Sequence, residues 1–499
     1  MKLALLIIFT LSIGFIFLYS LVQLSLIVSY FKAKKHPESS PKPWKEDLLP
    51  KVTIQLPLYN EFYVAERLLD TVSELDYPKD KLEIQILDDS DDETIDIVSR
   101  KVHEYQLKGY DICHIRRDER SGYKAGALAY GTKLAKGEYI AIFDADFLPD
   151  PQFIRKTIPY FQNEKIGVVQ TKWTYINGDY SFLTKVQEFG LNAHFTVEQV
   201  GRNHHDHFIN FNGTAGIWRK KCILDAGGWQ PDTLTEDLDL SYRAQLKGWK
   251  FKYLENLESP SELPVEINSL RAQQFRWTKG AAECVRKDLM PVLRSKKTSI
   301  GTKIHALFHL SNSTVFFFVL LLSILTLPVI TFKPEPEYTR IFQIASFFMI
   351  SWFILAAFYW VAYSYGKPQK LKLLVGFLWK FPLFLAISMG LAFHNTLAVI
   401  EGYIGRKSPF IRTPKFNIHD RADRWDNSKY AVKKVGPMTY IEGLFFIYFV
   451  CTLETAVLYQ NYGIIPLCVL LVTGYGIVFF SSIFHWKRSA KQLKYEEVF

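Results

Sequence analysis

The sequence predicts an α/β domain with a mixed, mostly parallel sheet, joined to α-helical transmembrane segments. The 499-residue chain is 48% apolar and 22% charged, and its apolar residues crowd into the first 30 residues and the stretch from about 305 to 485. Between these regions, short apolar runs alternate with longer mixed segments, which indicates strands alternating with helices. This pattern excludes a purely soluble enzyme, a disordered chain and a fibrous protein.

The first predicted element is a membrane-spanning helix over residues 1–31. Residues 3–31 carry no charge, and the run exceeds the ~20 residues that a helix needs to cross a bilayer. Residues 32–51 then carry six lysines against three acids. Because positive flanks stay in the cytoplasm, the linker 32–50 and the domain after it are expected on that side.

Residues 51–286 form the predicted cytoplasmic domain. The expected strands cover 52–56, ended by Pro57, 82–87 and 139–143, and the expected helices cover 61–74 and 92–107. Sheets of this kind bind ligands beyond the carboxyl ends of their strands. Acidic clusters follow two of the strands, so the site is expected at that edge.

The C-terminal half alternates apolar and basic stretches. We expect an interfacial segment at 287–311, a transmembrane hairpin at 312–364, an interface helix and cytoplasmic loop at 365–437, a second hairpin at 438–485 and a cytoplasmic tail at 486–499. Residues 371–400 are apolar but carry Lys372, Lys380, Pro382 and His394. If they spanned the membrane, the loop 401–437, with nine Lys and Arg against four acids, would lie outside. An interfacial or re-entrant helix keeps that loop in the cytoplasm.

The composition and the absence of certain motifs limit which binding partners and which classes of enzyme are expected. Five cysteines form no CxxC pair and are odd in number, so no disulfide framework or zinc ribbon is expected. The net charge of +10 suits an anionic membrane face, and no nucleic-acid partner is expected. The chain has neither a GxGxxG nor a GxxxxGK[ST] motif, which removes the main support for a dinucleotide or P-loop enzyme.

Asp144 and Asp146 are the sharpest chemical signal. They follow the strand at 139–143, and residues two apart in an extended chain point to the same side. Paired carboxylates repel each other unless a cation lies between them and an anionic ligand. Mg²⁺ or Mn²⁺ takes one or two carboxylates and completes its shell with phosphate oxygens. A solvated turn after a strand is the alternative.

Three further segments carry groups that suit a nucleotide sugar. Asp88 and Asp89 end the strand at 82–87 or cap the following helix. Segment 121–128 has glycines that allow the backbone to approach a ligand closely, and Lys124 could bind a phosphate. The alternative is an ordinary loop that enters a helix. Segment 235–239 supplies three acids, of which one can act as a general base, or which complement a helix dipole.

Segment 273–277 combines amides, a guanidinium and an indole. Arg276 can bind a diphosphate through paired hydrogen bonds, and Trp277 can stack on a sugar ring. An amphipathic helix at the membrane surface is the alternative. Together the segments describe a nucleotide-diphosphate site. It would contain a metal, basic side chains that stabilise the charge on the leaving diphosphate, a base for the incoming hydroxyl and an aromatic ring on which a sugar can stack.

The ordered motifs resemble the processive family 2 glycosyltransferases, which include cellulose, chitin and hyaluronan synthases. These motifs are LDDS, GYKAGAL, FDADF, TEDLDL and QQFRW. The resemblance is closest to the cellulose-synthase-like plant enzymes that make mannan, glucomannan or the xyloglucan backbone, through VTIQLPLYNE, HFTVEQ, FNGTAGIWR, AGGW and LKGWKF. It covers the whole cytoplasmic domain and implies the GT-A (Rossmann-like) fold.

The resemblance implies a role for each matching residue. The donor is expected to contact Asp88, Asp89, Lys124, Asp144, Gln273 and Arg276. Asp146, with Asp144 nearby, is expected to ligate Mg²⁺ or Mn²⁺, and Asp237 to be the catalytic base. The acceptor is expected to contact Phe211, Asn212, Gly213, Thr214 and Trp277. Phe410, Thr413 and Lys415 are similar to the gating loop of bacterial cellulose synthases, with Arg412 in place of the usual valine.

These roles imply a membrane-embedded, inverting glycosyltransferase. It would move hexose from GDP-mannose, UDP-glucose or both to a growing β-linked polysaccharide, and would export the product between its membrane helices. Aromatic residues that could stack on sugars there, or face lipid, are Trp352, Tyr359, Trp360 and Trp379. The expected location is the plasma (inner) membrane. A non-processive enzyme with a lipid acceptor and a transporter with a cytoplasmic regulatory domain are the alternatives.

Overall fold

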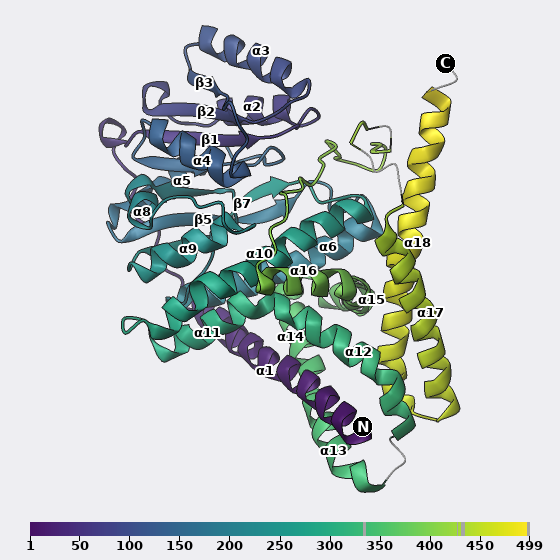
Figure 1. Cartoon of the computed structure of the whole chain (residues 1–499). Coiled ribbons are helices and arrows are strands. Elements are labelled where there is room, and N and C mark those ends of the chain that lie inside the picture. Colours follow the sequence, from purple (N-terminus) through teal and green to yellow (C-terminus); the bar gives the residue numbers. More distant parts are fainter. Residues whose placement is uncertain (333–335, 427, 431–434, 497–499) are drawn as a thin grey trace.

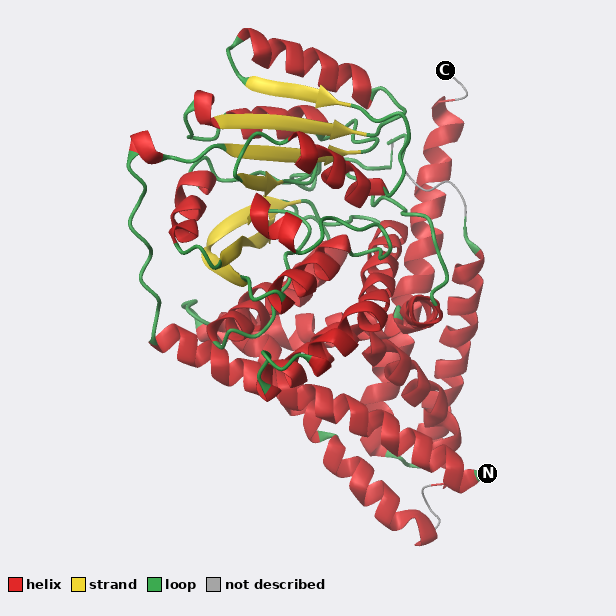
Figure 2. Cartoon of the chain, turned by 60° about the vertical axis from the view of Figure 1, so that its left-hand side comes forward, coloured by secondary structure: helices red, strands yellow, loops and turns green. Residues whose placement is uncertain are grey.

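A seven-stranded sheet and a fan of long helices make up the chain (Figures 1 and 2). The computed structural model describes residues 1–332, 336–426, 428–430 and 435–496. The strands are β1 (Val52–Leu58), β2 (Leu82–Asp88), β3 (Asp111–Ile115), β4 (Tyr139–Ile142), β5 (Ile166–Tyr175), β6 (Gly216–Arg219) and β7 (Lys250–Ser261). The predicted α/β domain with a mixed, mostly parallel sheet is confirmed.

The strand order is β3-β2-β1-β4-β6-β5-β7. All neighbours pair in parallel except β6, which runs antiparallel to β4 and β5. The first strand continues through Pro57 to Leu58, contrary to the expected end at Pro57. This is allowed because β4 pairs with β1 only as far as Gln55, so Pro57 pairs with β2 alone and its missing N–H breaks no ladder bond on the other side.

Helices cover both faces of the sheet. They are α2 (Ala65–Ser73), α3 (Thr94–Leu107), α4 (Tyr123–Leu134), α5 (Phe153–Thr157), α6 (Phe182–Ala193), the π-helical turn η4 (His194–Glu198), α7 (Gln199–His204), α8 (Lys220–Asp225) and α9 (Glu236–Leu246). One buried cluster includes Ile54 of β1, and a second, on the other face, includes Ile140 of β4. Burial on both faces explains why the parallel strands read as apolar runs.

The remaining helices form the fan below the sheet. They are α1 (Lys2–Lys35), α10 (Ile267–Arg294), α11 (Ile300–Leu310), α12 (Val315–Phe332), α13 (Thr339–Phe348), α14 (Ile350–Ser364), α15 (Lys370–Gly390), α16 (Ala392–Ile404), α17 (Pro437–Leu458) and α18 (Ile465–Glu496). Within the described chain, six helical stretches are long and apolar enough to cross a membrane: 2–35, 300–332, 336–364, 370–390, 437–458 and 462–488.

Two predicted segments differ from the observed helices. The single helix expected over 371–400 is two helices, α15 and α16, and α15 is one of the six apolar stretches. The boundary expected at residue 286 falls inside α10, which continues to Arg294. Helix α16 packs along α10, so these two helices link the sheet domain to the fan.

Glycines allow α15 and α18 to approach closely. A Cβ atom added at Gly474 would lie 1.9 Å from the Ala386 carbonyl oxygen, and one added at Gly390 would lie 2.4 Å from the Gly474 carbonyl oxygen. Small residues let helix backbones meet in this way in membranes, where apolar burial alone does not drive association.

We predict that Gly474→Ala destabilises the helix fan, because the new methyl group forces α15 and α18 apart. The expected loss is about 1–3 kcal/mol, visible as a lower thermal unfolding midpoint of the purified protein in detergent. Gly463→Ala is the matched control, since a Cβ atom there meets nothing within 4 Å. Equal midpoints for Gly474→Ala and the wild type would show that the helix pair tolerates the added volume.

Candidate active site

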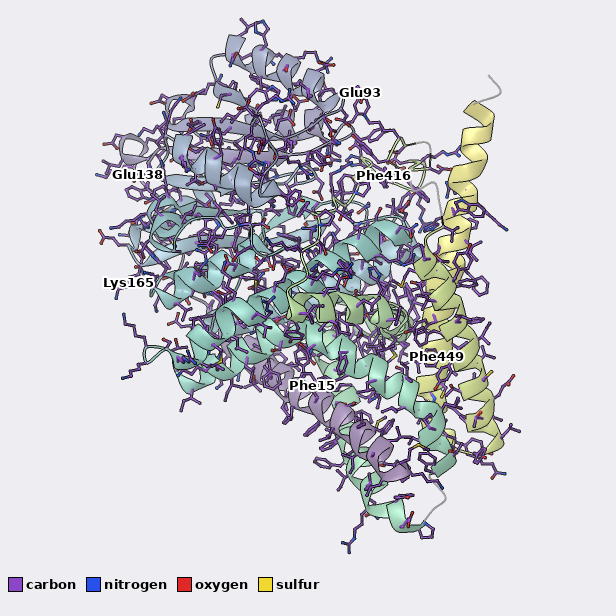
Figure 3. The ribbon with its side chains drawn as sticks, viewed as in Figure 1. Phe15, Glu93, Glu138, Lys165, Phe416 and Phe449 are labelled. Carbon is purple, nitrogen blue, oxygen red and sulfur yellow. The ribbon has the colours of Figure 1, made fainter. Side chains whose placement is uncertain are left out.

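The candidate site lies where the parallel strands end. Glu93, which follows β2, and Phe416, on the loop after α16, lie on the side of the domain facing α18, whereas Glu138 and Lys165, which precede β4 and β5, mark the opposite edge (Figure 3). A cleft of about 160 Å³ opens at the carboxyl edge. The predicted residues that line it are Asp89, Lys124, Asp144, Asp146, Asn212, Gly213, Asp237, Gln273, Arg276, Trp277, Phe410, Thr413 and Lys415.

Asp88 and Asp89 have different surroundings. Asp88 is buried; His114 donates to its Oδ2 (2.8 Å) and the Ser90 N–H to its Oδ1 (2.9 Å). It therefore fixes the turn after β2 and does not line the cleft, contrary to the expected donor contact. Asp89 does line the cleft, but Arg117 binds both of its oxygens at 3.0 and 2.5 Å.

Two cleft residues beside Asp89 were not predicted. The Arg120 guanidinium lies 3.3 Å from the ring centroid of Tyr59, and both residues line the cleft. Stacked guanidinium and aromatic groups present flat surfaces that suit a planar base. They come from segments 61 residues apart, so neither local spacing nor composition marks them as a pair.

Lys124 bridges two parts of the site. Its Nζ donates to Asp144 Oδ1 (2.5 Å) and to the Gly213 carbonyl oxygen (2.9 Å). Although burial disfavours the ammonium, Asp144 and Glu236 raise the pKa of Lys124 overall, so it stays cationic. Gly122, with φ of +70°, starts the helix that carries Lys124. The left-handed conformation at this position explains the glycine.

Asp146 pairs with Lys415 of the loop after α16. Its Oδ2 accepts from Lys415 Nζ (2.7 Å) and from the Glu262 N–H (3.1 Å). Among the described residues, no group of three or more His, Cys, Asp or Glu side chains could hold a metal ion. The carboxylates of Asp144 and Asp146 are hard oxygen donors that fit Mg²⁺ or Mn²⁺ once phosphate oxygens complete the coordination shell.

Asp237 lies at the start of α9, with Glu236 beside it. Its Oδ1 accepts the Leu238 N–H (2.9 Å), and a Cβ atom at Gly213 would come within 3.0 Å of its Oδ2. Gly213 therefore keeps the carboxylate accessible. Burial raises the pKa of Asp237, and Glu236 raises it further. A carboxylate with a raised pKa suits proton abstraction near neutral pH.

Helix α10 presents Gln273, Arg276 and Trp277 to the cleft. Residues three and four apart share one helix face, which explains why the motif brings these three together. The Arg276 guanidinium lies 4.9 Å from the Phe410 ring centroid. Gln273 and Trp277 also line a second, larger cavity.

The predicted acceptor segment 211–214 is only partly at the site. Phe211 is fully buried against Trp218 and Trp229, and Thr214 is fully buried with its hydroxyl accepting the Asp144 N–H (2.8 Å). These two side chains support the site from behind, which corrects their expected contact with the acceptor. Asn212 and Gly213 do line the cleft.

The loop after α16 covers the cleft. Phe410 stacks on Tyr123 (5.9 Å between centroids), and Arg412 pairs with Glu61 (2.8 Å). Burial raises the pKa of Glu61 to about 7, although Arg412 opposes the shift. Glu61 was not predicted, because its partner lies 351 positions away in the sequence.

A cavity of about 880 Å³ extends from the cleft into the helix fan. The residues common to both spaces are Trp173, Leu191, Asn212, Thr235, Asp237, Gln273 and Trp277. The cavity reaches Phe9 of α1 and Asn461 between α17 and α18. Of the four aromatics named from the sequence, Trp352 and Tyr359 line it, whereas Trp360 and Trp379 are not among its lining residues.

Comparison with known proteins yields relatives for much of the chain. The family model described as "Glycosyltransferase like family 2" matches residues 50–280. Glucomannan 4-beta-mannosyltransferase 1 of Oryza sativa subsp. japonica is 37% identical over 383 residues, covering 73% of this chain and 69% of the relative. Glucomannan 4-beta-mannosyltransferase 2 of Arabidopsis thaliana is 44% identical over 276 residues, covering 54% and 50%.

One solved structure supports the fold. A mannosyltransferase from Pyrobaculum calidifontis in complex with GDP-Man and Mn²⁺ aligns with a TM-score of 0.53 and 19% identity. The alignment covers 82% of this chain and all of that protein. The expected GT-A fold is thereby confirmed.

We predict that replacing Arg412 and Lys415 with alanine releases the loop from the cleft. The change leaves Glu61 and Asp146 without their cations, which is costly because both carboxylates are buried. Limited proteolysis within 405–418 should become several-fold faster. Arg406→Ala is the control, because Arg406 is 69% exposed and pairs with Glu401 outside the cleft. An unchanged cleavage rate in the double variant would mean that other contacts hold the loop.

Proposed function

Because the chain belongs to the glycosyltransferase family of the glucomannan 4-β-mannosyltransferases, we propose that it transfers mannosyl units from GDP-mannose to a growing β-1,4-linked mannan or glucomannan. UDP-glucose is the expected second donor for a mixed product. The observation that carries the proposal is the seam between the two cavities, where Asp237 and Trp277 belong to both spaces. Donor and acceptor can meet there.

The donor is proposed to bind along the carboxyl edge of the sheet. The base would lie near Asp89 and the stacked Arg120 and Tyr59, while Lys124, Gln273 and Arg276 would face the diphosphate. Asp146, with Asp144 nearby, would hold Mg²⁺ or Mn²⁺ together with phosphate oxygens. When bound, such an ion stabilises the negative charge that develops on the leaving diphosphate.

Asp237 is proposed to act as the general base. The acceptor hydroxyl, oriented by stacking of its sugar on Trp277, would give its proton to Asp237 and attack the anomeric carbon opposite the departing nucleoside diphosphate, which inverts the configuration. Arg276 would stabilise the charge on the leaving group through charge-assisted hydrogen bonds. The loop bearing Phe410, Thr413 and Lys415 would close over the bound donor.

The larger cavity is proposed to carry the product across the membrane. It passes among helices that are long and apolar enough to span a bilayer, and a polar chain made in the cytoplasm needs such a path. The expected location is the plasma (inner) membrane with the sheet domain in the cytoplasm.

The proposed topology leaves α15 on the cytoplasmic side of the bilayer. If α1, α12 and α13–α14 each cross once, the chain returns to the side of the sheet domain at Ser364. The loop after α16 is ion-paired with Glu61 and Asp146 of the sheet domain. Residues 370–404 therefore cannot cross an odd number of times, which supports an interfacial or re-entrant position.

The direct test is an assay of the purified full chain with GDP-mannose and UDP-glucose, followed by linkage analysis. We expect β-1,4-linked mannose in the product and release of GDP. Chelation of divalent ions should abolish transfer, and Mg²⁺ or Mn²⁺ should restore it. Transfer from neither donor would overturn the proposed function, and full turnover in chelator would remove the metal from it.

We predict that Asp237→Asn lowers transfer by about 10²–10⁴-fold, the usual contribution of a general base, while GDP binding persists. In the wild type, kcat/KM should fall as the pH drops through a pKa well above the ordinary aspartate value of ~3.9, because the base must be unprotonated and burial raises its pKa. An Asn variant with wild-type turnover would assign proton removal to another group.

A further inference from the structure

The wall of the larger cavity, which Trp277 also lines, carries a carboxylate that the proposed function does not use. Among the described residues that line this cavity, the acids are Asp237 and Glu198, and no lysine or arginine lines it. Glu198 is only 9% exposed. It ends the π-helical turn η4, and π-turns inside helices recur at functional sites.

Two basic neighbours hold the Glu198 carboxylate in place. Arg202 Nη2 donates to Oε1 (2.7 Å), and His194 Nδ1 lies 2.9 Å from Oε2. Burial disfavours the charge, but Arg202 and then His194 keep the pKa of Glu198 below its ordinary value. A carboxylate has about four lone-pair positions, and these two bonds leave capacity for further donors.

The surroundings favour a neutral, hydroxyl-rich ligand over a cation. Arg202 compensates the charge of Glu198, so little net negative charge is left to retain an ion. Trp173 Nε1 and Asn212 Nδ2 are buried donors without a hydrogen-bond partner in the described protein, and both residues lie at the seam. His194 Nε2 lies 3.2 Å from Asn212 Oδ1, which connects Glu198 to the seam.

We infer that Glu198, together with the Trp173 N–H, forms a second acceptor subsite that binds the hydroxyls of a neutral hexosyl unit behind the sugar on Trp277. This inference rests on the proposed function. Glu198 accepts from the sugar hydroxyls through charge-assisted bonds, and Trp173 donates to one of them. The subsite holds the chain in register, so that longer acceptors bind more tightly than short ones.

The test is calorimetric binding of methyl β-mannoside and β-1,4-linked mannopentaose to the purified full chain. The wild type is expected to bind the pentaose more tightly. Glu198→Gln should weaken pentaose binding about tenfold, and Trp173→Phe, which keeps an aromatic ring against Phe195, about fivefold. Both variants should bind methyl β-mannoside, whose single sugar unit reaches only the Trp277 position, nearly as well as the wild type.

Glu188→Gln is the matched control, because Glu188 is a partly buried glutamate on α6 that lines neither cavity. Retained GDP binding in every variant shows that the donor site is intact. Undiminished pentaose binding in both variants, or no pentaose binding by the wild type, would overturn the subsite. A wild type that binds the pentaose but transfers no sugar to it would instead overturn the proposed function.

Discussion

Compensation of buried carboxylates is the constraint on which the site depends. The carboxyl edge of the sheet collects acids, and each of four is paired with a cation from another segment: Asp89 with Arg117, Asp144 with Lys124, Asp146 with Lys415 and Glu61 with Arg412. Asp144 is 34% exposed, but Glu61 and Asp146 are buried, and without their cations these two charges would oppose folding. The pairs also define the cleft, since two of the cations come from the loop that covers it.

Helix α10 connects this charged edge to the membrane part. Its Arg271 binds Glu442 of α17 and Ser482 of α18, and its Lys279 pairs with Glu401 of α16 (3.1 Å). The same helix presents Arg276 and Trp277 to the cleft. One helix therefore positions the proposed diphosphate-binding and acceptor-binding side chains relative to the helices that enclose the larger cavity, and small displacements at a reacting centre are costly in rate.

Local pattern predicted much of the fold and the cleft, because strand ends and helix faces have fixed periods. Asp144, Asp146 and the 273–277 segment followed from these rules. The same rules could not find Glu61, Arg117 or Glu198, whose partners are set by tertiary contacts. The sequence motif does not show which residues of the 211–214 bend face the cleft: Asn212 and Gly213 line it, whereas the side chains of Phe211 and Thr214 are buried. The division of 371–400 into two helices was likewise invisible in its apolar composition.

The seam has a consequence for how long a product can become. Because Trp277 borders both cavities, a sugar added at the proposed acceptor position would have to advance by only one unit to free that position. If the larger cavity carries the product as proposed, the polymer then stays threaded through the protein between turnovers. Chain length would be governed by how rarely the threaded polymer escapes, and not by how quickly a released end is recaptured.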